Sequence, residues 1–400
     1  MRPEAERDTI NRAKETRPVN TDDRIRVLHL LPPSTGGMRT HVLTLLDHFD
    51  RRRFDISLAA PAAVQKSITE ERLYGARFDA LELAEVAEPL GLVYGSLHLS
   101  ALLHRRRTHI LHSHGIRAML AAGLGGRTAP VRIATLHHPL SAGLSLAARH
   151  VVAYAYKTQT HCIATGQAIR NELLALGLPK ERIAVISNGV AAHRPSAREV
   201  ATALGEAGLP EGRPLAVIPS RYALNGGPEL KEMVERLITA SNCSIAFTGQ
   251  AVDDPVLRDV REALPADRVF FCGYVRDLQA VLCGADVVAL PAPGKATPLT
   301  ALEAMACGVC VVTAPGGELA EVIADGVTGR VSPSNAAEPF AATVLSVLAA
   351  RAEARRMGAA AREFVLEAFS ADVMIRKLEA LYIELLETTS GSTEGAAAQG

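Results

Sequence analysis

The chain has 400 residues, of which 48% are hydrophobic and 22% are charged, and its 43 Lys and Arg residues balance 43 Asp and Glu residues. This length predicts two sizeable domains, and the composition excludes collagen-like and wholly disordered proteins. A neutral net charge argues against a nucleic-acid-binding protein, because phosphate binding draws on a basic excess. Every window of eighteen residues contains a charged side chain, so no membrane-spanning helix is predicted.

The cysteines and the N-terminus predict a cytoplasmic protein. Six cysteines in a chain of this length do not indicate a disulfide framework, and their apolar surroundings favour small buried hydrophobic residues in a reducing compartment. A Cys-x-x-Cys pair at 307 and 310 has no second pair at a zinc-type spacing. Residues 1–22 are charged throughout, so no secretory signal is predicted. The cysteines are Cys162, Cys243, Cys272, Cys283, Cys307 and Cys310.

Short β-branched runs alternate with helical patterns between two predicted disordered tails, residues 1–22 and 388–400. A helix is expected over about 39–48, directly after the first strand and a Pro/Gly turn. This alternation predicts an α/β domain over 23–195, with a parallel sheet covered by helices on both faces. Its strands are expected at 25–31, 55–59, 109–112, 132–136, 161–164 and 183–186.

A second series of the same kind begins after residue 213 and predicts another doubly wound domain over 196–370. Ser370 is the expected N-cap of a last helix over 371–387. Two such domains direct the carboxyl ends of their strands into facing crevices, so a cleft between them is the expected ligand site. The strands of the second series are expected at 215–219, 244–248, 268–271, 286–290 and 309–313.

Two segments carry candidate binding chemistry. Gly36 and Gly37 join the first strand to the first helix, where backbone N–H groups can approach an anion; a simple tight turn is the alternative. The segment PLTALEAMACG, residues 298–308, places Thr300 at a helix start and Glu303 in its first turns. Glu303 is suited to binding ribose hydroxyls, and a solvated helix carboxylate is the alternative.

These segments, taken with others in order along the chain, resemble retaining glycosyltransferase family 4 (glycosyl transferases group 1). The resemblance covers roughly residues 24–387 and implies a GT-B architecture, two Rossmann-like domains facing across a cleft. The N-terminal domain would then bind the acceptor and the C-terminal domain the nucleotide sugar, with the final helix crossing back. The supporting motifs are Gly36-Gly37, His112-x-His114-Gly115, Thr135-x-His137, Ser187-Asn188-Gly189-Val190, Phe271-Cys272-Gly273-Tyr274-Val275, Pro315-Gly316-Gly317-Glu318 and Asp325-Gly326-Val327-Thr328-Gly329.

The resemblance also implies roles for single residues. His137 would lie beside the donor sugar near the reacting carbon, and Arg221 would neutralise the departing diphosphate. The family scheme is front-face attack with retention, assisted by the leaving phosphate, and implies neither a metal nor another cofactor. The donor-binding residues implied or expected are Gly36, Gly37, Arg221, Val275, Lys295, Leu299, Thr300 and Glu303.

Two positions depart from the family pattern. Gly226 stands where the family usually has a second diphosphate-binding Lys, and Lys295 stands where it usually has a sugar-binding Glu. Three interpretations remain open: Lys295 supplies the missing cation, the sugar selectivity is altered, or the site has decayed into a catalytically impaired scaffold.

Two further groups of residues could bind a metal or a lipid surface. His112 and His114 share one face of a strand, but no carboxylate or cysteine cluster completes a metal site, so no metal is expected. The runs 51–53 and 105–107 are each three arginines, which are either solvated or aimed at an anionic lipid surface.

The sequence therefore predicts a cytoplasmic retaining glycosyltransferase that uses a nucleotide-diphosphate sugar and a hydroxyl acceptor, with peripheral membrane contact as an option. A nucleotide-sugar-binding scaffold and an epimerase on the same fold are the alternatives. The nucleobase, the sugar, the acceptor (cell-envelope glycan, glycolipid or small metabolite) and the oligomeric state stay open.

Overall fold

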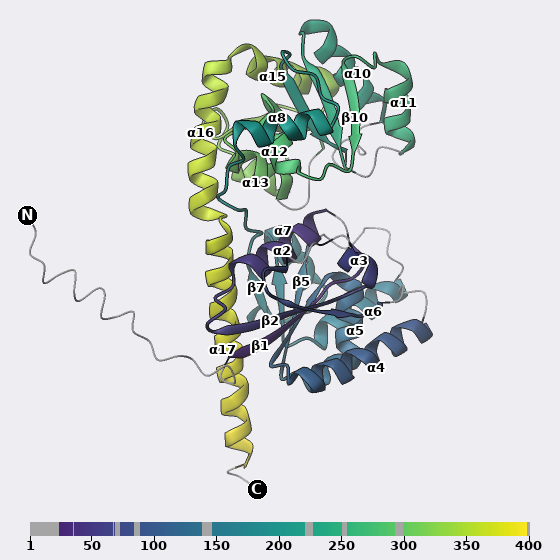
Figure 1. Cartoon of the computed structure of the whole chain (residues 1–400), viewed down its shortest axis with the longest axis vertical. Helices are drawn as coiled ribbons and strands as arrows, with labels where there is room; N and C mark the ends of the chain where they lie inside the picture. Colours follow the sequence, from purple (N-terminus) through teal and green to yellow (C-terminus); the bar gives the residue numbers. More distant parts are fainter. Residues whose placement is uncertain are drawn as a thin grey trace, which may run out of the picture.

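The computed structural model describes residues 24–34, 36–66, 68, 73–83, 89–137, 146–220, 227–249, 254–292 and 299–397. The predicted disordered tail 1–22 lies outside these residues. Two parallel sheets, each flanked by helices, form an N-terminal and a C-terminal domain, and the last two helices, placed end to end, run along one domain and then the other (Figure 1). The α/β, GT-B-like arrangement expected from the sequence is confirmed.

The N-terminal sheet has seven parallel strands in the order β3-β2-β1-β4-β5-β6-β7. The order reverses direction between β1 and β4, which is the switch point where ligands bind in open α/β sheets. Six of these strands were predicted; the seventh, at the sheet edge, is short and carries partly exposed charges. The strands are β1 (Ile25–Leu30), β2 (Phe54–Ala60), β3 (Arg77–Ala80), β4 (Ile110–His114), β5 (Val131–Leu136), β6 (His161–Ala164) and β7 (Ile183–Val185).

Two layers of helices cover this sheet. Helices α4 (Pro89–Arg106), α5 (Gly115–Gly125) and α6 (Leu146–Lys157) pack on one face, and α2 (Gly37–His48) and α3 (Ala62–Lys66) pack on the other. Helix α7 (Gln167–Ala175) joins β6 to β7. Alternating residues of β1 supply both cores, since Leu28 and Leu30 face α4 and α5 while Val27 faces α2.

The C-terminal sheet has six parallel strands in the order β10-β9-β8-β11-β12-β13. Five were predicted, and the sixth has only two residues. The strands are β8 (Leu215–Pro219), β9 (Ser244–Thr248), β10 (Val269–Gly273), β11 (Val287–Leu290), β12 (Cys310–Thr313) and β13 (Arg330–Val331). The helices are α8 (Ala197–Glu206), α10 (Gly227–Ala240), α11 (Pro255–Ala263), α12 (Leu278–Cys283), α13 (Leu299–Ala306), α14 (Glu318–Val322), α15 (Ala337–Ala349) and α16 (Arg351–Ala368).

The last helix, α17 (Ala371–Ala397), returns from the C-terminal to the N-terminal domain (Figure 1). Ser370 caps it as expected, its Oγ accepting from the N–H of Val373 at 3.4 Å. Tyr382 of α17 is fully buried among the α2-side core of the N-terminal sheet. The helix continues ten residues past position 387, so the prediction of a disordered tail from 388 is wrong as far as Ala397.

Candidate active site

The first loop of the N-terminal domain meets the start of α13 in the C-terminal domain. Gly36 precedes α2 with a φ of 74°, a left-handed conformation that favours glycine. A Cβ on Gly37 would lie 4.0 Å from Cβ of Leu299, the first residue of α13. The structure thus brings together Gly36, Gly37, Leu299 and the adjacent Thr300, which the sequence placed in one donor site.

Glu303 lies on the second turn of α13 and is half-buried. Burial raises the pKa of its carboxyl from 4.5 to about 7. Among the residues that the structure describes, none forms an ion pair or a side-chain hydrogen bond with this carboxyl. A desolvated, unpaired carboxyl is typical of a group that awaits a ligand.

Val275 follows β10, and its half-buried side chain packs against the core of the C-terminal sheet. Arg221, Gly226 and Lys295 lie outside the described residues; Arg221 directly follows the buried Ser220 at the end of β8.

His137 follows β5 and is only 6% exposed. Its Nε2 lies 3.2 Å from Nδ1 of His114, and Nε2 of His114 lies 3.1 Å from Nδ1 of His29. Because a neutral imidazole has one donor and one acceptor nitrogen, both hydrogen bonds of His114 must run in the same direction. If Nε2 of His137 donates to His114, Nδ1 of His29 on β1 therefore accepts from His114, and if Nδ1 of His29 donates, Nε2 of His137 accepts.

The neighbouring His112, whose ring stacks on that of His114 with centroids 4.3 Å apart, connects to the last helix. Nδ1 of His112 lies 2.6 Å from the hydroxyl of Tyr382, and Nε2 of His112 lies 2.6 Å from Oγ1 of Thr135. The ring of His41, from α2, packs edge-on against that of His137 with centroids 4.6 Å apart. Residues from three strands and two helices therefore meet around the predicted catalytic histidine.

Burial keeps these imidazoles neutral. It lowers the pKa of His29 from 6.5 to about 3 and that of His41 to about 4, where a hydrogen bond with the Asn188 side chain opposes the shift. The pKa values of His112 and His114 lie well below 6.5, first because of burial and then because of the neighbouring histidines. Neutral imidazoles are the form that hydrogen-bonds in chains and also the form that ligates metals.

Two histidine triads have nitrogens close enough to share a metal ion, within 4.8 Å of one another. His114 belongs to both. Both nitrogens of His112 already hold hydrogen bonds at 2.6 Å, and the contacts of His114 on both sides fit hydrogen bonds. Hydrogen bonds therefore explain why the nitrogens of His29, His112 and His114 lie close together. The expectation that the site holds no metal stays a prediction. The triads are His29, His112 and His114, and His41, His114 and His137.

Glu318 joins the two domains and was not assigned a role from the sequence. It is 9% exposed, and its carboxylate accepts a hydrogen bond from the N–H of Ala168 in the first turn of α7. A carboxylate at a helix N-terminus is stabilised by the helix dipole. Gly166 allows this approach, because a Cβ there would lie 2.0 Å from the Glu318 carboxylate.

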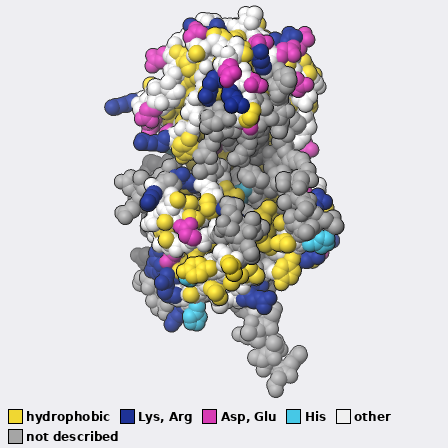
Figure 2. Space-filling view, turned by 90° about the vertical axis from the view of Figure 1, so that its right-hand side faces the viewer, with side chains coloured by type: hydrophobic (Ala, Val, Ile, Leu, Met, Phe, Trp, Pro, Cys, Tyr) yellow, Lys and Arg dark blue, Asp and Glu magenta, His cyan; other side chains and the backbone are white. Residues whose placement is uncertain are grey.

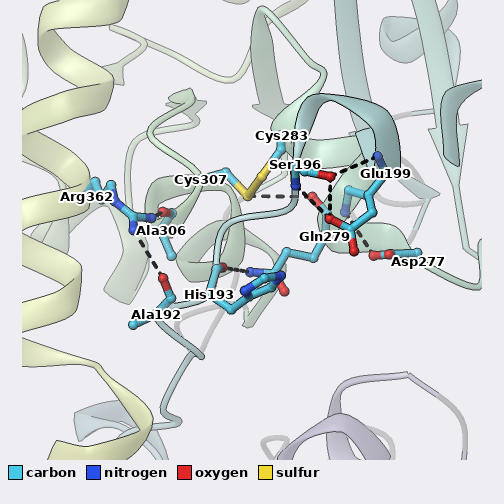
Figure 3. The surroundings of a disulfide bond; sticks show 11 residues. Ala192, His193, Ser196, Glu199, Asp277, Gln279, Cys283, Ala306, Cys307 and Arg362 are labelled. Atoms are coloured by element: carbon cyan, nitrogen blue, oxygen red, sulfur yellow. Dashed lines mark hydrogen bonds between the residues drawn. A yellow bond between two sulfur atoms is a disulfide. The ribbon is translucent and has the colours of Figure 1, made fainter. Parts of the chain in front are cut away.

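A disulfide between Cys283 and Cys307 ties the end of α12 to the residue after α13 (Figure 3). The expectation that all six cysteines are unpaired buried residues is therefore wrong for this pair, although Cys162, Cys243 and Cys310 are buried thiols. The Arg362 side chain bonds to the carbonyl oxygens of Ala306 and Ala192 beside the disulfide. These contacts fix the far end of the helix that carries Glu303.

Four residues of this site escaped sequence interpretation: His29, His41, Glu318 and Tyr382. His29 carried a local signal, as a polar residue inside the apolar run of the first strand. Glu318 stood in a motif that supports the family resemblance, although no role was assigned to it. Gly125 is the last residue of α5 and Gly126 follows it. A Cβ on Gly125 would lie 2.0 Å from the Ser96 carbonyl oxygen, so that glycine serves the packing of α4 on α5.

Comparison with known proteins agrees with this geometry. Sequence profiles described as "Glycosyltransferase Family 4" and "Glycosyl transferases group 1" match residues 35–194 and 217–350. N-acetyl-alpha-D-glucosaminyl L-malate synthase of Bacillus anthracis is 24% identical over 298 residues, 72% of this chain and 78% of that protein. Alpha-maltose-1-phosphate synthase of Mycobacterium tuberculosis is 30% identical over 233 residues, 52% of this chain and 59% of that protein.

A solved structure shares the whole architecture. The crystal structure of Anabaena Alr3699/HepE in complex with UDP and glucose superposes with a TM-score of 0.75 at 17% identity, covering 90% of this chain and 99% of that one. At this identity the likeness establishes the GT-B fold alone. With both halves matched by profiles and the fold shared, the chain belongs to the family 4, group 1 glycosyltransferases and is a transferase enzyme.

Proposed function

We propose that this enzyme transfers a sugar, with retention of configuration, from a nucleotide-diphosphate sugar to a hydroxyl acceptor. The observation that carries the proposal is Glu303 on α13, one helical turn after Leu299, which lies beside Gly37. Burial raises the pKa of the Glu303 carboxyl to about 7, and within the described part of the chain no residue pairs with it. A ribose diol can supply the two O–H donors that such a carboxylate lacks. UDP-sugars are the first donors to test, because the Anabaena structure holds UDP and glucose.

The remaining roles follow the chemistry of each side chain. Gly36 and Gly37 offer backbone N–H groups at the start of α2 to the donor phosphates. Arg221 neutralises the diphosphate as it leaves, and the Val275 backbone meets the base. His137, held by His114, binds the donor sugar near the reacting carbon. Front-face attack, assisted by the leaving phosphate, needs no metal. The acceptor is a cell-envelope glycan in polysaccharide biosynthesis, a glycolipid or a small metabolite.

The test is calorimetry with a panel of nucleoside diphosphates and their sugars, followed by donor-hydrolysis and transfer assays. We expect one nucleoside diphosphate to bind well above the others and its sugar conjugate to be turned over. Absence of binding by every nucleotide contradicts the proposal. Release of an altered nucleotide sugar without any acceptor indicates an epimerase.

Gly226 and Lys295 support one alternative, a nucleotide-sugar-binding protein with impaired catalysis. Binding of a donor without turnover across a broad acceptor panel favours it. If Lys295 instead replaces the missing phosphate cation, Lys295→Ala weakens donor binding roughly 10- to 150-fold, the equivalent of one charge-assisted hydrogen bond. Unchanged affinity contradicts that role for Lys295.

A further inference from the structure

Helix α4 exposes an apolar stripe. Leu90, Val93, Tyr94 and Leu97 are 85%, 51%, 63% and 64% exposed, and they recur at the three- and four-residue spacing of one helix face. The opposite face, with Leu99, Leu102 and Leu103, packs on the sheet core. The core contacts of α4 therefore leave its second apolar face exposed.

The stripe extends over the neighbouring helices of the same layer. Leu124 of α5 and Val151 and Tyr154 of α6 are 54%, 48% and 63% exposed. With the four residues of α4 they make up seven of the eleven large hydrophobic side chains that are exposed in the described part of the chain. We call these seven residues the α4–α6 patch. Figure 2 shows a band of hydrophobic side chains over the N-terminal domain, with Lys, Arg and His side chains around it.

The segment that carries the patch has charge of one sign, although Asp79 of β3 forms ion pairs with Arg105 and Arg106 at the end of α4. From residue 89 to residue 171, between Glu88 and Glu172, the sequence contains nine Lys and Arg residues and no Asp or Glu. The whole chain has equal numbers of basic and acidic residues, 43 of each. The segment that forms α4, α5 and α6 is nevertheless basic along its whole length. The exposed basic residues of this segment are His98, His104, Arg105, Arg107, Arg127, Arg149, His150 and Lys157.

We propose that the α4–α6 patch docks on a membrane surface rich in anionic lipid, with the apolar stripe in the interface and the basic side chains at the headgroups. An apolar helix face with a basic rim is the chemistry of interfacial binding. None of the described helices combines the length and apolarity needed to cross a bilayer.

A second copy of the chain fits this surface less well. In a symmetric dimer the same patch lies against itself, so the basic rims of the two copies would face each other and repel. Anionic headgroups complement both the apolar and the basic part of the patch.

The first experiment is co-sedimentation of the full chain with phosphatidylcholine vesicles and with vesicles that also contain phosphatidylglycerol. Binding is expected only to the anionic vesicles and is expected to weaken as salt increases, because salt screens exposed charges. Equal binding to both vesicle types, or none to either, overturns the proposal. This readout needs no enzymatic activity, so its failure is distinguishable from failure of the proposed function.

Surface variants locate the contact. Val93→Asp with Leu97→Asp should abolish binding, whereas Val327→Asp, at a residue also 51% exposed but in the C-terminal domain, should leave it unchanged. Arg105→Glu with Arg107→Glu should weaken binding at least about 25-fold, since each basic residue near an anionic surface contributes roughly fivefold. The matched control is Arg351→Glu with Arg355→Glu on α16.

A second copy of the chain as the partner of the patch would give a different result. If the wild-type chain forms a dimer in the absence of lipid and Val93→Asp with Leu97→Asp makes it monomeric, the patch is a protein interface and the membrane proposal is wrong. Equal loss of vesicle binding in the patch variants and in both controls also overturns it.

Discussion

The two domains treat their buried titratable groups in opposite ways. At the carboxyl ends of the N-terminal strands, His114 is hydrogen-bonded to His29 and His137. His112 is hydrogen-bonded to Tyr382 and Thr135. In the C-terminal domain Glu303 is desolvated yet meets no such partner among the described residues. The N-terminal histidines are thus held by hydrogen bonds and ring contacts with one another and with neighbouring side chains, whereas the Glu303 carboxyl has no such contact among the described residues.

The largest expected effect is on the free energy of unfolding and comes from the buried histidines of the N-terminal domain. Because the folded pKa values of His29 and His41 are about 3 and 4, the unfolded chain takes up protons below pH 6.5 that the folded protein does not. The free energy of unfolding should fall as pH drops below 6.5, by about 2 kcal/mol per buried histidine at pH 5. Chemical denaturation at pH 8 and at pH 5 measures this.

A pair of variants makes that test specific. His29→Phe should remove about one proton from the pH dependence of the unfolding free energy, while the exposed His193→Phe should leave the dependence unchanged. Equal stability of the wild type at pH 8 and pH 5 contradicts the neutral network.

The next effect concerns how firmly α13 is held. Closing the 24-residue separation between Cys283 and Cys307 restricts the unfolded chain, and its loss should cost about 3 kcal/mol of unfolding free energy. Thermal unfolding with and without a reductant measures the loss. Cys283→Ala with Cys307→Ala should abolish the response to reductant, and Cys272→Ala should retain it. A wild-type protein insensitive to the reductant shows that the bond is absent.

The next prediction concerns the binding of the nucleotide by the Glu303 carboxylate. Ribose hydroxyls bind the ionised carboxyl better, so donor affinity should rise as pH increases through about 7 and then level off. Glu303→Gln should weaken nucleotide binding roughly 10- to 150-fold and remove this pH dependence. Calorimetric titration across this pH range provides both measurements. If the Gln variant binds the nucleotide with wild-type affinity, Glu303 does not contact the nucleotide.

The smallest effect concerns the link between the two halves. Glu318→Gln keeps an acceptor for the Ala168 N–H but removes the charge, so the unfolding free energy should fall by about 1 kcal/mol. Glu321→Gln, exposed on the same helix, is the control and should have little effect. If both variants are equally stable, the Glu318 contact contributes nothing measurable.

Local patterns predicted most of the fold. Each of the eleven expected strands exists. They could be predicted because buried parallel strands have continuous apolar sequences. The two missed strands lie at sheet edges, where Arg77–Ala80 carries partly exposed charges and Arg330–Val331 is too short to stand out. The extension of α17 was missed because a Thr, Ser and Gly-rich composition argues against a helix.

The sequence by itself determined the two parallel sheets, the glycine loop before α2 and the position of Glu303 on α13, because each depends on residues close together in the chain. The tertiary structure alone decided the partners of these groups. Residues 29, 114 and 137 become neighbours only when β1, β4 and β5 lie side by side, and residue 382 meets residue 112 only when α17 returns. The Cys283–Cys307 bond likewise needs two helices to end at the same place. Contacts of this kind leave no spacing rule in the sequence, since the fold and not the chain sets the distance.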